Sequence, residues 1–277
     1  MTSVSELSDR RRFDRGGDIP GLDADLCESE ENGASRAGRT NTEWVYETLK
    51  GAILDGTLEP GTAISQSTLF QSISVSRTPV REAIRMLQAE GWLESQPNKR
   101  ARVAPLSASD VEQQFAARIA LEGLAVGISV PHMADDLPEM RDLLRQMRVA
   151  VEAHDYEAWV TPHKAFHRAL TRGAGEMIGQ LCASLSDSTQ RYINLCMKDM
   201  PMAYMLGEAE HQTIYEACEE GNSLVASSLL AKHLARTAIQ LVGILDPSRE
   251  PTPIRTAVKL IGDPGIDAPS TKSRGAL

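Results

Sequence analysis

Hydrophobic residues recur at helical spacing over residues 43–55. Val45, Leu49 and Ile53 follow one another at steps of four, and Gly56 closes the pattern, which predicts a first helix. After a Pro-Gly turn, a shorter apolar cluster predicts a second helix. Each segment has one apolar face, so we expect both helices to pack on a shared core.

A third helix is predicted by the stretch SVSRTPVREA, residues 74–83. Ser76 suits a helix N-cap, and the proline lies in the first turn, where it costs no intrahelical hydrogen bond. Two stripes follow at helical spacing. The apolar stripe consists of Val80, Ile84 and Leu87, and the cationic stripe consists of Arg77, Arg81 and Arg85. The helix is therefore expected to bury one edge and to present guanidinium groups beside Thr78.

Two short strands are predicted directly after this third helix. The segments 92–95 and 101–104 flank a turn over 96–100. Three helices followed by a two-stranded ribbon are typical of a winged helix-turn-helix. A plain three-helix core would leave the arginine stripe without an explanation. We therefore assign residues 42–105 to a winged helix-turn-helix DNA-binding domain.

The rest of the chain divides into a helical region and two tails. From about 108 to 245 the pattern predicts roughly six helices and no alternating strands. The fold class is therefore mainly α, with the N-terminal winged helix-turn-helix followed by an all-helical bundle over 107–245. Residues 1–41 are rich in Gly, Ser and charged residues, and 246–277 contain five prolines. Both segments are expected to be flexible tails.

Charge changes this picture only when it is counted by region. The net charge of −9 argues against a generally basic nucleic-acid binder, yet residues 77–102 hold six Arg and Lys against three Glu. The four cysteines form no C-x-x-C pair, which favours reduced thiols. No signal peptide and no apolar run long enough for a bilayer are present, so we expect a cytoplasmic protein without a membrane partner.

Both halves of the chain contain short motifs typical of a known family. The motifs are GTLEPG (56–61), SVSRTPVREAIRMLQAEGWL (74–93), the ribbon after it, ARIALEG (117–123), AFH (165–167), Glu210-His211 and His233. They resemble those of the GntR family of bacterial transcription regulators, with the helical half similar to the FCD effector-binding domain of the FadR-like subfamily. The resemblance implies a ligand-responsive regulator that binds a palindromic operator as a homodimer. It also implies repression of neighbouring catabolic genes and a small organic acid as effector.

The resemblance places the family's operator contacts on Arg77, Thr78 and Arg81. The predicted helix agrees with this, because an arginine can fork onto guanine while hydroxyl groups and helix N-terminal amides hold phosphates. At the tip of the wing, Arg100 stands where the family usually has glycine, and this cation is expected to add a phosphate or minor-groove contact. The further candidate DNA contacts are Ser76, Arg85 and Lys99.

Four of the six histidines are candidate metal ligands. His163 and His167 lie four residues apart on one predicted helix, so both imidazoles point the same way. His211 and His233 lie on two later predicted helices. The FCD family commonly holds a metal with an aspartate and three histidines, and His163 stands at the aspartate position. Four imidazoles favour zinc, nickel or copper over manganese or magnesium, so the expected cofactor is a divalent ion, zinc or nickel. The alternative is that these are ordinary polar or core histidines.

Arg118 also has two interpretations. It lies one turn before Glu122 on a predicted helix, so it forms either an intrahelical ion pair or a clamp for an effector carboxylate.

Two other classes of function fit the sequence less well. A zinc hydrolase with H-x-x-x-H has its general-base glutamate directly after the first histidine, where this chain has Lys164, and a fourth histidine would fill the position that catalytic zinc leaves open. A constitutive architectural DNA binder would not need a helical domain twice the size of its DNA-reading domain. We therefore expect no enzymatic activity.

Overall fold

The computed structural model describes residues 40–72, 75–96, 100–197 and 201–262. Contacts within the chain define two compact units, residues 1–107 with 190–195 and residues 108–189 with 196–277. The tail predicted over 1–41 falls almost entirely outside the described residues, as does Lys99. Among the residues described, no helix is long and apolar enough to cross a membrane.

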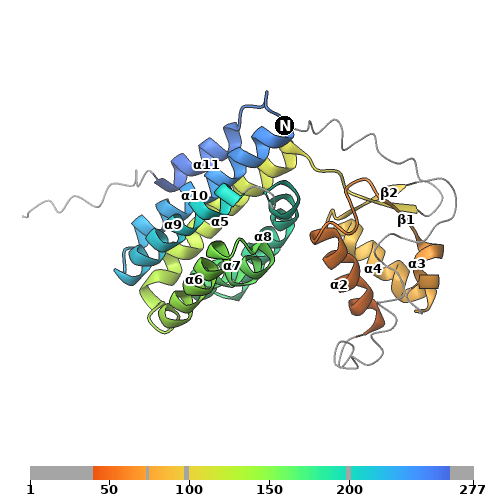
Figure 1. Ribbon diagram of the computed structural model, residues 1–277, viewed down its shortest axis with the longest axis horizontal. Coiled ribbons are helices and arrows are strands. Elements are labelled where there is room, and N and C mark those ends of the chain that lie inside the picture. The colour runs from red at the N-terminus through yellow and green to blue at the C-terminus, as the bar shows by residue number, and fades with distance from the viewer. Residues whose placement is uncertain (1–39, 73–74, 97–99, 198–200, 263–277) are drawn as a thin grey trace, which may run out of the picture. The chain divides into compact units, whose positions relative to one another are not determined.

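The first unit contains helices and a small sheet (Figure 1). In chain order, its described elements are α2 (Asn41–Leu54), β1 (Ala63–Ser65), α3 (Gln66–Ser72), α4 (Arg77–Ala89), β2 (Leu93–Gln96) and β3 (Arg100–Val103). The antiparallel sheet has the order β1-β3-β2, so β3 is central. The sequence predicted only β2 and β3, because a three-residue strand is too short to show an alternating pattern. The mainly α fold with an N-terminal wing is confirmed.

The apolar stripes of α2 and α4 form the core of this unit. Both predicted triplets are buried: Val45, Leu49 and Ile53 on α2, and Val80, Ile84 and Leu87 on α4. Helix α4 ends where Gly91 adopts a φ of +76°, a conformation that glycine takes without strain. Ser76 occupies the N-cap position of α4 in an extended conformation, but its hydroxyl makes no cap hydrogen bond. Packing of the apolar stripe thus leaves the arginine stripe of α4 facing outward.

The second unit is a bundle of helices (Figure 1). Its described helices are α5 (Ala108–Ser129), α6 (Leu137–Glu152), α7 (Tyr156–Thr171), α8 (Glu176–Met197), α9 (Pro201–Glu219), α10 (Ser223–Leu245) and α11 (Thr252–Gly262), with short 3-10 turns at Val130–His132 and Arg172–Ala174. Helix α5 packs against α10 and α11, and α6 packs against α7 and α9. The six helices predicted over the bundle correspond to α5 through α10.

Helix α11 contradicts the predicted flexible tail over 246–277. Its residue Ile254 is fully buried, and Ile261 lies so close to Gly123 of α5 that a Cβ at that glycine would be 3.0 Å from the isoleucine side chain. Of the five prolines that suggested a tail, Pro251 directly precedes α11 and Pro253 lies in its first turn, where a missing N–H group breaks no intrahelical hydrogen bond. The tail prediction is therefore wrong for Thr252–Gly262.

Candidate DNA-reading helix and metal centre

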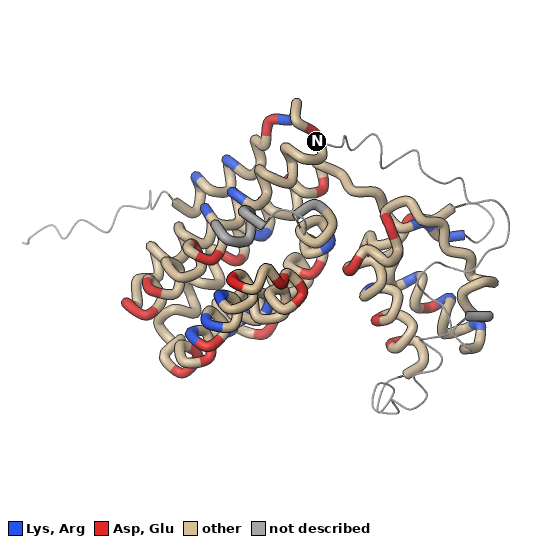
Figure 2. Tube along the Cα trace, viewed as in Figure 1, with Lys and Arg blue, Asp and Glu red and all other residues tan. Residues whose placement is uncertain are grey.

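The predicted DNA contacts in the described part of the chain lie on the surface of the first unit. Arg77, Thr78, Arg81 and Arg85 are exposed along α4, as are Ser76 at its N-cap and Arg100 at the start of β3. The basic positions of this helix can be followed in Figure 2.

An acidic residue lies among these arginines. Arg85 donates from Nη1 to Glu82 Oε1 at 3.1 Å, and Arg81 Nε lies 3.6 Å from the same oxygen. All three side chains are at least 43% exposed, and ion pairs at such exposure contribute little to stability. Both arginines can therefore exchange Glu82 for a DNA phosphate or base at small cost.

The four candidate histidines come together inside the second unit. His163 and His167 come from α7, His211 from α9 and His233 from α10. All four are buried, and one nitrogen from each lies within 4.8 Å of the others. The i, i+4 spacing on α7 therefore predicted one half of a cluster that two further helices complete.

The distances within the cluster fit a metal ion. His167 Nε2 and His211 Nε2 are 3.3 Å apart. Two nitrogens at about 2.0–2.1 Å from zinc in a tetrahedral arrangement are separated by about 3.3–3.4 Å. The ring of His163 stacks on the indole of Trp159, one turn earlier on α7, with centroids 4.1 Å apart. This stacking fixes the plane of the His163 imidazole.

The electrostatics of the cluster favour neutral imidazoles. Burial, reinforced by positive charge on neighbouring imidazoles, lowers the pKa of His163, His211 and His233 well below the ordinary value. A neutral imidazole is the form that binds a metal. Buried Nδ1 atoms of His163, His167 and His211 have no hydrogen-bond partner among the described residues. A buried cluster of four imidazoles, three of them with a lowered pKa, offers a set of nitrogen donors that fits a bound divalent ion.

The carboxylate of Glu210 lies within hydrogen-bond distance of His233. Glu210 Oε2 lies 2.7 Å from His233 Nδ1, and Glu210 in turn accepts two hydrogen bonds from Arg236, Nε to Oε1 at 2.7 Å and Nη2 to Oε2 at 2.8 Å. Because a carboxylate only accepts hydrogen bonds, neutral His233 must carry its proton on Nδ1. Its Nε2 is then the nitrogen free to bind a metal.

A second carboxylate lies near His167. Glu122 Oε2 is 3.8 Å from His167 Nδ1, while Arg118 donates to Glu122 at 2.6 Å and to the Thr189 hydroxyl at 2.7 Å. Burial alone would raise the pKa of Glu122, but the Arg118 guanidinium and the hydrogen bonds outweigh it and lower the pKa to about 2. Of the two interpretations of Arg118, the intrahelical ion pair is present, with Glu122 ionised, and the effector clamp stays a prediction.

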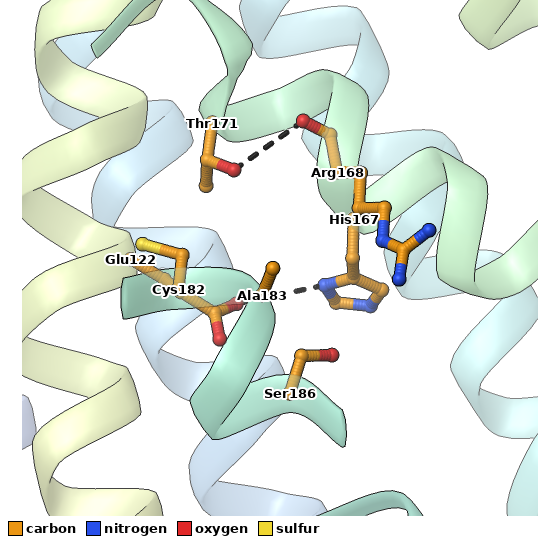
Figure 3. Close-up of a pocket in the computed structure, with 7 residues that line it drawn as sticks. All are labelled: Glu122, His167, Arg168, Thr171, Cys182, Ala183 and Ser186. Carbon is orange, nitrogen blue, oxygen red and sulfur yellow. Dashed lines mark hydrogen bonds and ion pairs between the residues drawn. The ribbon is translucent and has the colours of Figure 1, made fainter. Parts of the chain in front are cut away.

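A small cavity opens beside His167 on the α7–α8 side of the bundle. It is lined by Glu122, His167, Arg168, Thr171, Cys182, Ala183 and Ser186, and it admits little more than a water-sized molecule. Figure 3 shows Glu122 of α5 and His167 of α7 turned toward each other, with a dashed line between them. This contact could not be predicted from the sequence, because it joins residues 45 positions apart. Glu210 had one sequence signal, its place directly before His211.

Comparisons with known proteins agree with both halves of the molecule. Residues 41–103 match the model described as "Bacterial regulatory proteins, gntR family", and residues 113–236 match the model of the FCD domain. Helix α11 lies outside both matches. The chain is 31% identical over 207 residues to an HTH-type transcriptional regulator of Streptomyces ambofaciens, covering 73% of this chain and 85% of that protein.

Two further similarities extend the comparison. The HTH-type transcriptional repressor GlaR of Escherichia coli is 27% identical over 199 residues, covering 68% of this chain and 90% of the repressor. A solved structure of a GntR transcriptional regulator from Rhodococcus sp. RHA1 superposes with a TM-score of 0.63 at 25% identity, covering 73% of this chain and 97% of that chain.

Proposed function

We propose that this chain, which belongs to the GntR family and carries an FCD domain, is a homodimeric repressor controlled by a small carboxylate. Its family makes it a DNA-binding transcriptional regulator rather than an enzyme. The effector binds at a divalent metal, zinc or nickel, held by the four histidines. The observation that carries the proposal is the buried cluster itself, with one nitrogen from each histidine within 4.8 Å of the others. The name of the relative GlaR supports repression.

The charge balance around the cluster supports an anionic effector. Arg118 neutralises Glu122, and Arg236 neutralises Glu210, so these four side chains add no net charge. Four neutral imidazoles leave the charge of a bound divalent ion uncompensated. A metal at this site would supply a positive centre to which a carboxylate can coordinate. In this proposal Arg118 remains a candidate contact, and the effector would compete with Glu122 for its guanidinium.

On the DNA side, Arg77, Thr78 and Arg81 read the operator from α4. Ser76 and Arg85 hold phosphates next to them, and Arg100 contacts the backbone or minor groove from the wing, while Lys99, outside the described residues, stays a candidate contact by its sequence position. A two-fold symmetric dimer places two such helices on the half-sites of a palindrome.

The test is the linkage between effector and operator. Full-length protein, either zinc-loaded or stripped with chelator, is titrated onto labelled DNA from upstream of its own gene in the presence of a panel of small carboxylates. We expect one carboxylate to weaken binding about 5–150-fold for loaded protein only, and DNA to weaken carboxylate binding by the same factor. His167→Ala should keep operator affinity and lose the response, whereas the exposed His132→Ala should keep both. An equal response from stripped protein would overturn the metal-centred mechanism.

A further inference from the structure

Glu210, next to His233, and Glu122, next to His167, are both paired with an arginine but lie at different distances from their histidines. Glu210 and Glu122 each receive two hydrogen bonds from an arginine, yet only Glu210 lies within hydrogen-bond distance of its histidine, at 2.7 Å against 3.8 Å. The two pairs therefore have the same charge and different geometry. This difference identifies which carboxylate acts on the ring itself.

Glu210 also connects the helices that carry two of the histidines. It lies next to His211 on α9, and its carboxylate reaches His233 and Arg236 on α10. The Glu210 side chain thus links α9 to α10, orients the His233 ring and carries a negative charge close to the proposed metal centre. These three roles predict different results when the side chain is changed.

We propose that Glu210 is a positioning residue for the metal, and that its hydrogen bond holds His233 in the Nδ1–H tautomer with Nε2 toward the centre. This inference rests on the metal role proposed above. Hydrogen bonds from a ligand histidine to a carboxylate fix its tautomer and ring orientation and raise its basicity.

The first comparison separates hydrogen bonding from charge. Glu210→Ala and Glu210→Gln both remove the negative charge, but the glutamine oxygen can still accept from His233 Nδ1. Glu210→Ala should weaken zinc binding by about 10–100-fold, and Glu210→Gln should recover a large part of that loss. If the two variants bind zinc equally, only the charge matters and the positioning role is overturned.

The second comparison separates the orientation of His233 by Glu210 from the ion pair with which Glu210 links α9 to α10. Arg236→Gln breaks the same ion pair as Glu210→Ala but leaves the Glu210–His233 hydrogen bond in place. It also removes a cation near the metal, so zinc affinity should stay the same or rise, opposite in sign to Glu210→Ala. Equal losses in Arg236→Gln and Glu210→Ala would mean that Glu210 acts only as a link between helices.

The measurement is competition for zinc between purified full-length protein and a chromophoric chelator, with the metal-free fold checked by circular dichroism. Glu220→Gln, an exposed charge change at the end of α9, serves as the control and should bind zinc like wild type. If Glu210→Ala does not fold, the pair Glu210→Gln and Arg236→Gln decides: the inference requires Glu210→Gln to bind more weakly than Arg236→Gln. Wild type that binds no zinc would overturn the proposed function and this inference together, whereas a zinc-binding wild type with unaffected Glu210 variants overturns the inference alone.

Discussion

The same chemical pair, an arginine with a glutamate, is used in opposite ways in the two units. On α4, Arg85 and Glu82 form an exposed pair with side chains 64% and 43% accessible. In the bundle, Arg118 and Glu122 form a pair that is 4% and 2% accessible. An exposed pair is weak and can be exchanged for another partner, whereas a buried pair becomes part of the fold because either charge alone is costly. Burial thus separates the exposed arginines of α4, which can exchange partners at small cost, from Arg118, whose buried partner any competing ligand would have to displace.

The largest expected effect tests this contrast directly. Arg118→Met leaves Glu122 as an uncompensated buried charge and should lower the free energy of unfolding by about 3–5 kcal/mol. The matched surface change, Arg85→Met, should alter it by less than about 0.5 kcal/mol. Urea unfolding of the metal-free proteins, followed by circular dichroism, gives both values. Equal costs would remove the distinction between the two pairs.

The second prediction concerns DNA affinity, for which the exposed arginines of α4 should matter more than the arginines of the bundle. Arg77→Ala or Arg81→Ala should cost about 1–3 kcal/mol in operator binding and relax specificity at one position in each half-site, with little change in stability. Fluorescence anisotropy with single-base operator variants measures this. Arg168→Ala, an exposed arginine of the bundle, is the control. The assignment of α4 as the reading helix fails if both α4 variants bind like wild type.

Local signals made much of the fold predictable from sequence. The three helices of the first unit and the six main helices of the bundle follow from apolar spacing and from breaks at glycine and proline. The pair His163 and His167 was accessible for the same reason, since residues four apart share a helix face.

The remaining features depend on packing between distant segments. Strand β1 forms because it pairs with β3. Helix α11 is stabilised by the burial of Ile254. Similarly, the approach of Glu122 to His167 and of Glu210 to His233 arises from helix packing that no single window of sequence encodes. Burial of Arg118 is of this kind too, and burial decides what its ion pair does.

The third prediction extends the comparison to a buried carboxyl without a bonded arginine. Both oxygens of Glu208 are buried with no hydrogen-bond partner among the described residues, and burial raises its pKa from 4.5 to about 7. Since the folded pKa lies above the unfolded one, the ionised carboxylate destabilises the fold progressively as pH rises through this window. Glu208→Gln should therefore raise stability at pH 8 by about 1–2 kcal/mol, a value reduced for partial exposure, and have little effect near pH 4.5.

Thermal unfolding at the two pH values measures this effect. The exposed Glu216→Gln on the same helix should show no such pH dependence. An equal shift at both pH values would mean that Glu208 is not held in its neutral form by burial.

The smallest effect is expected at the wing. Arg100 is exposed at the start of β3, and a single phosphate contact contributes about one unit to the slope of log affinity against log salt. Arg100→Gly should therefore weaken binding uniformly across DNA sequences and reduce the slope by about one. A variant with the wild-type slope would show that this arginine is solvated and does not contact DNA.

The most direct test of the central claim is elemental analysis of protein purified without a histidine tag. A metal centre held by the four histidines predicts about one zinc or nickel ion per chain in wild type and in the control His132→Ala, and loss of the ion in His167→Ala. His163→Asp should retain a metal and shift its preference toward harder ions. Wild type that stays metal-free after growth with added zinc, with the same thermal stability before and after chelator, would contradict the metal centre and leave the four histidines as structural residues.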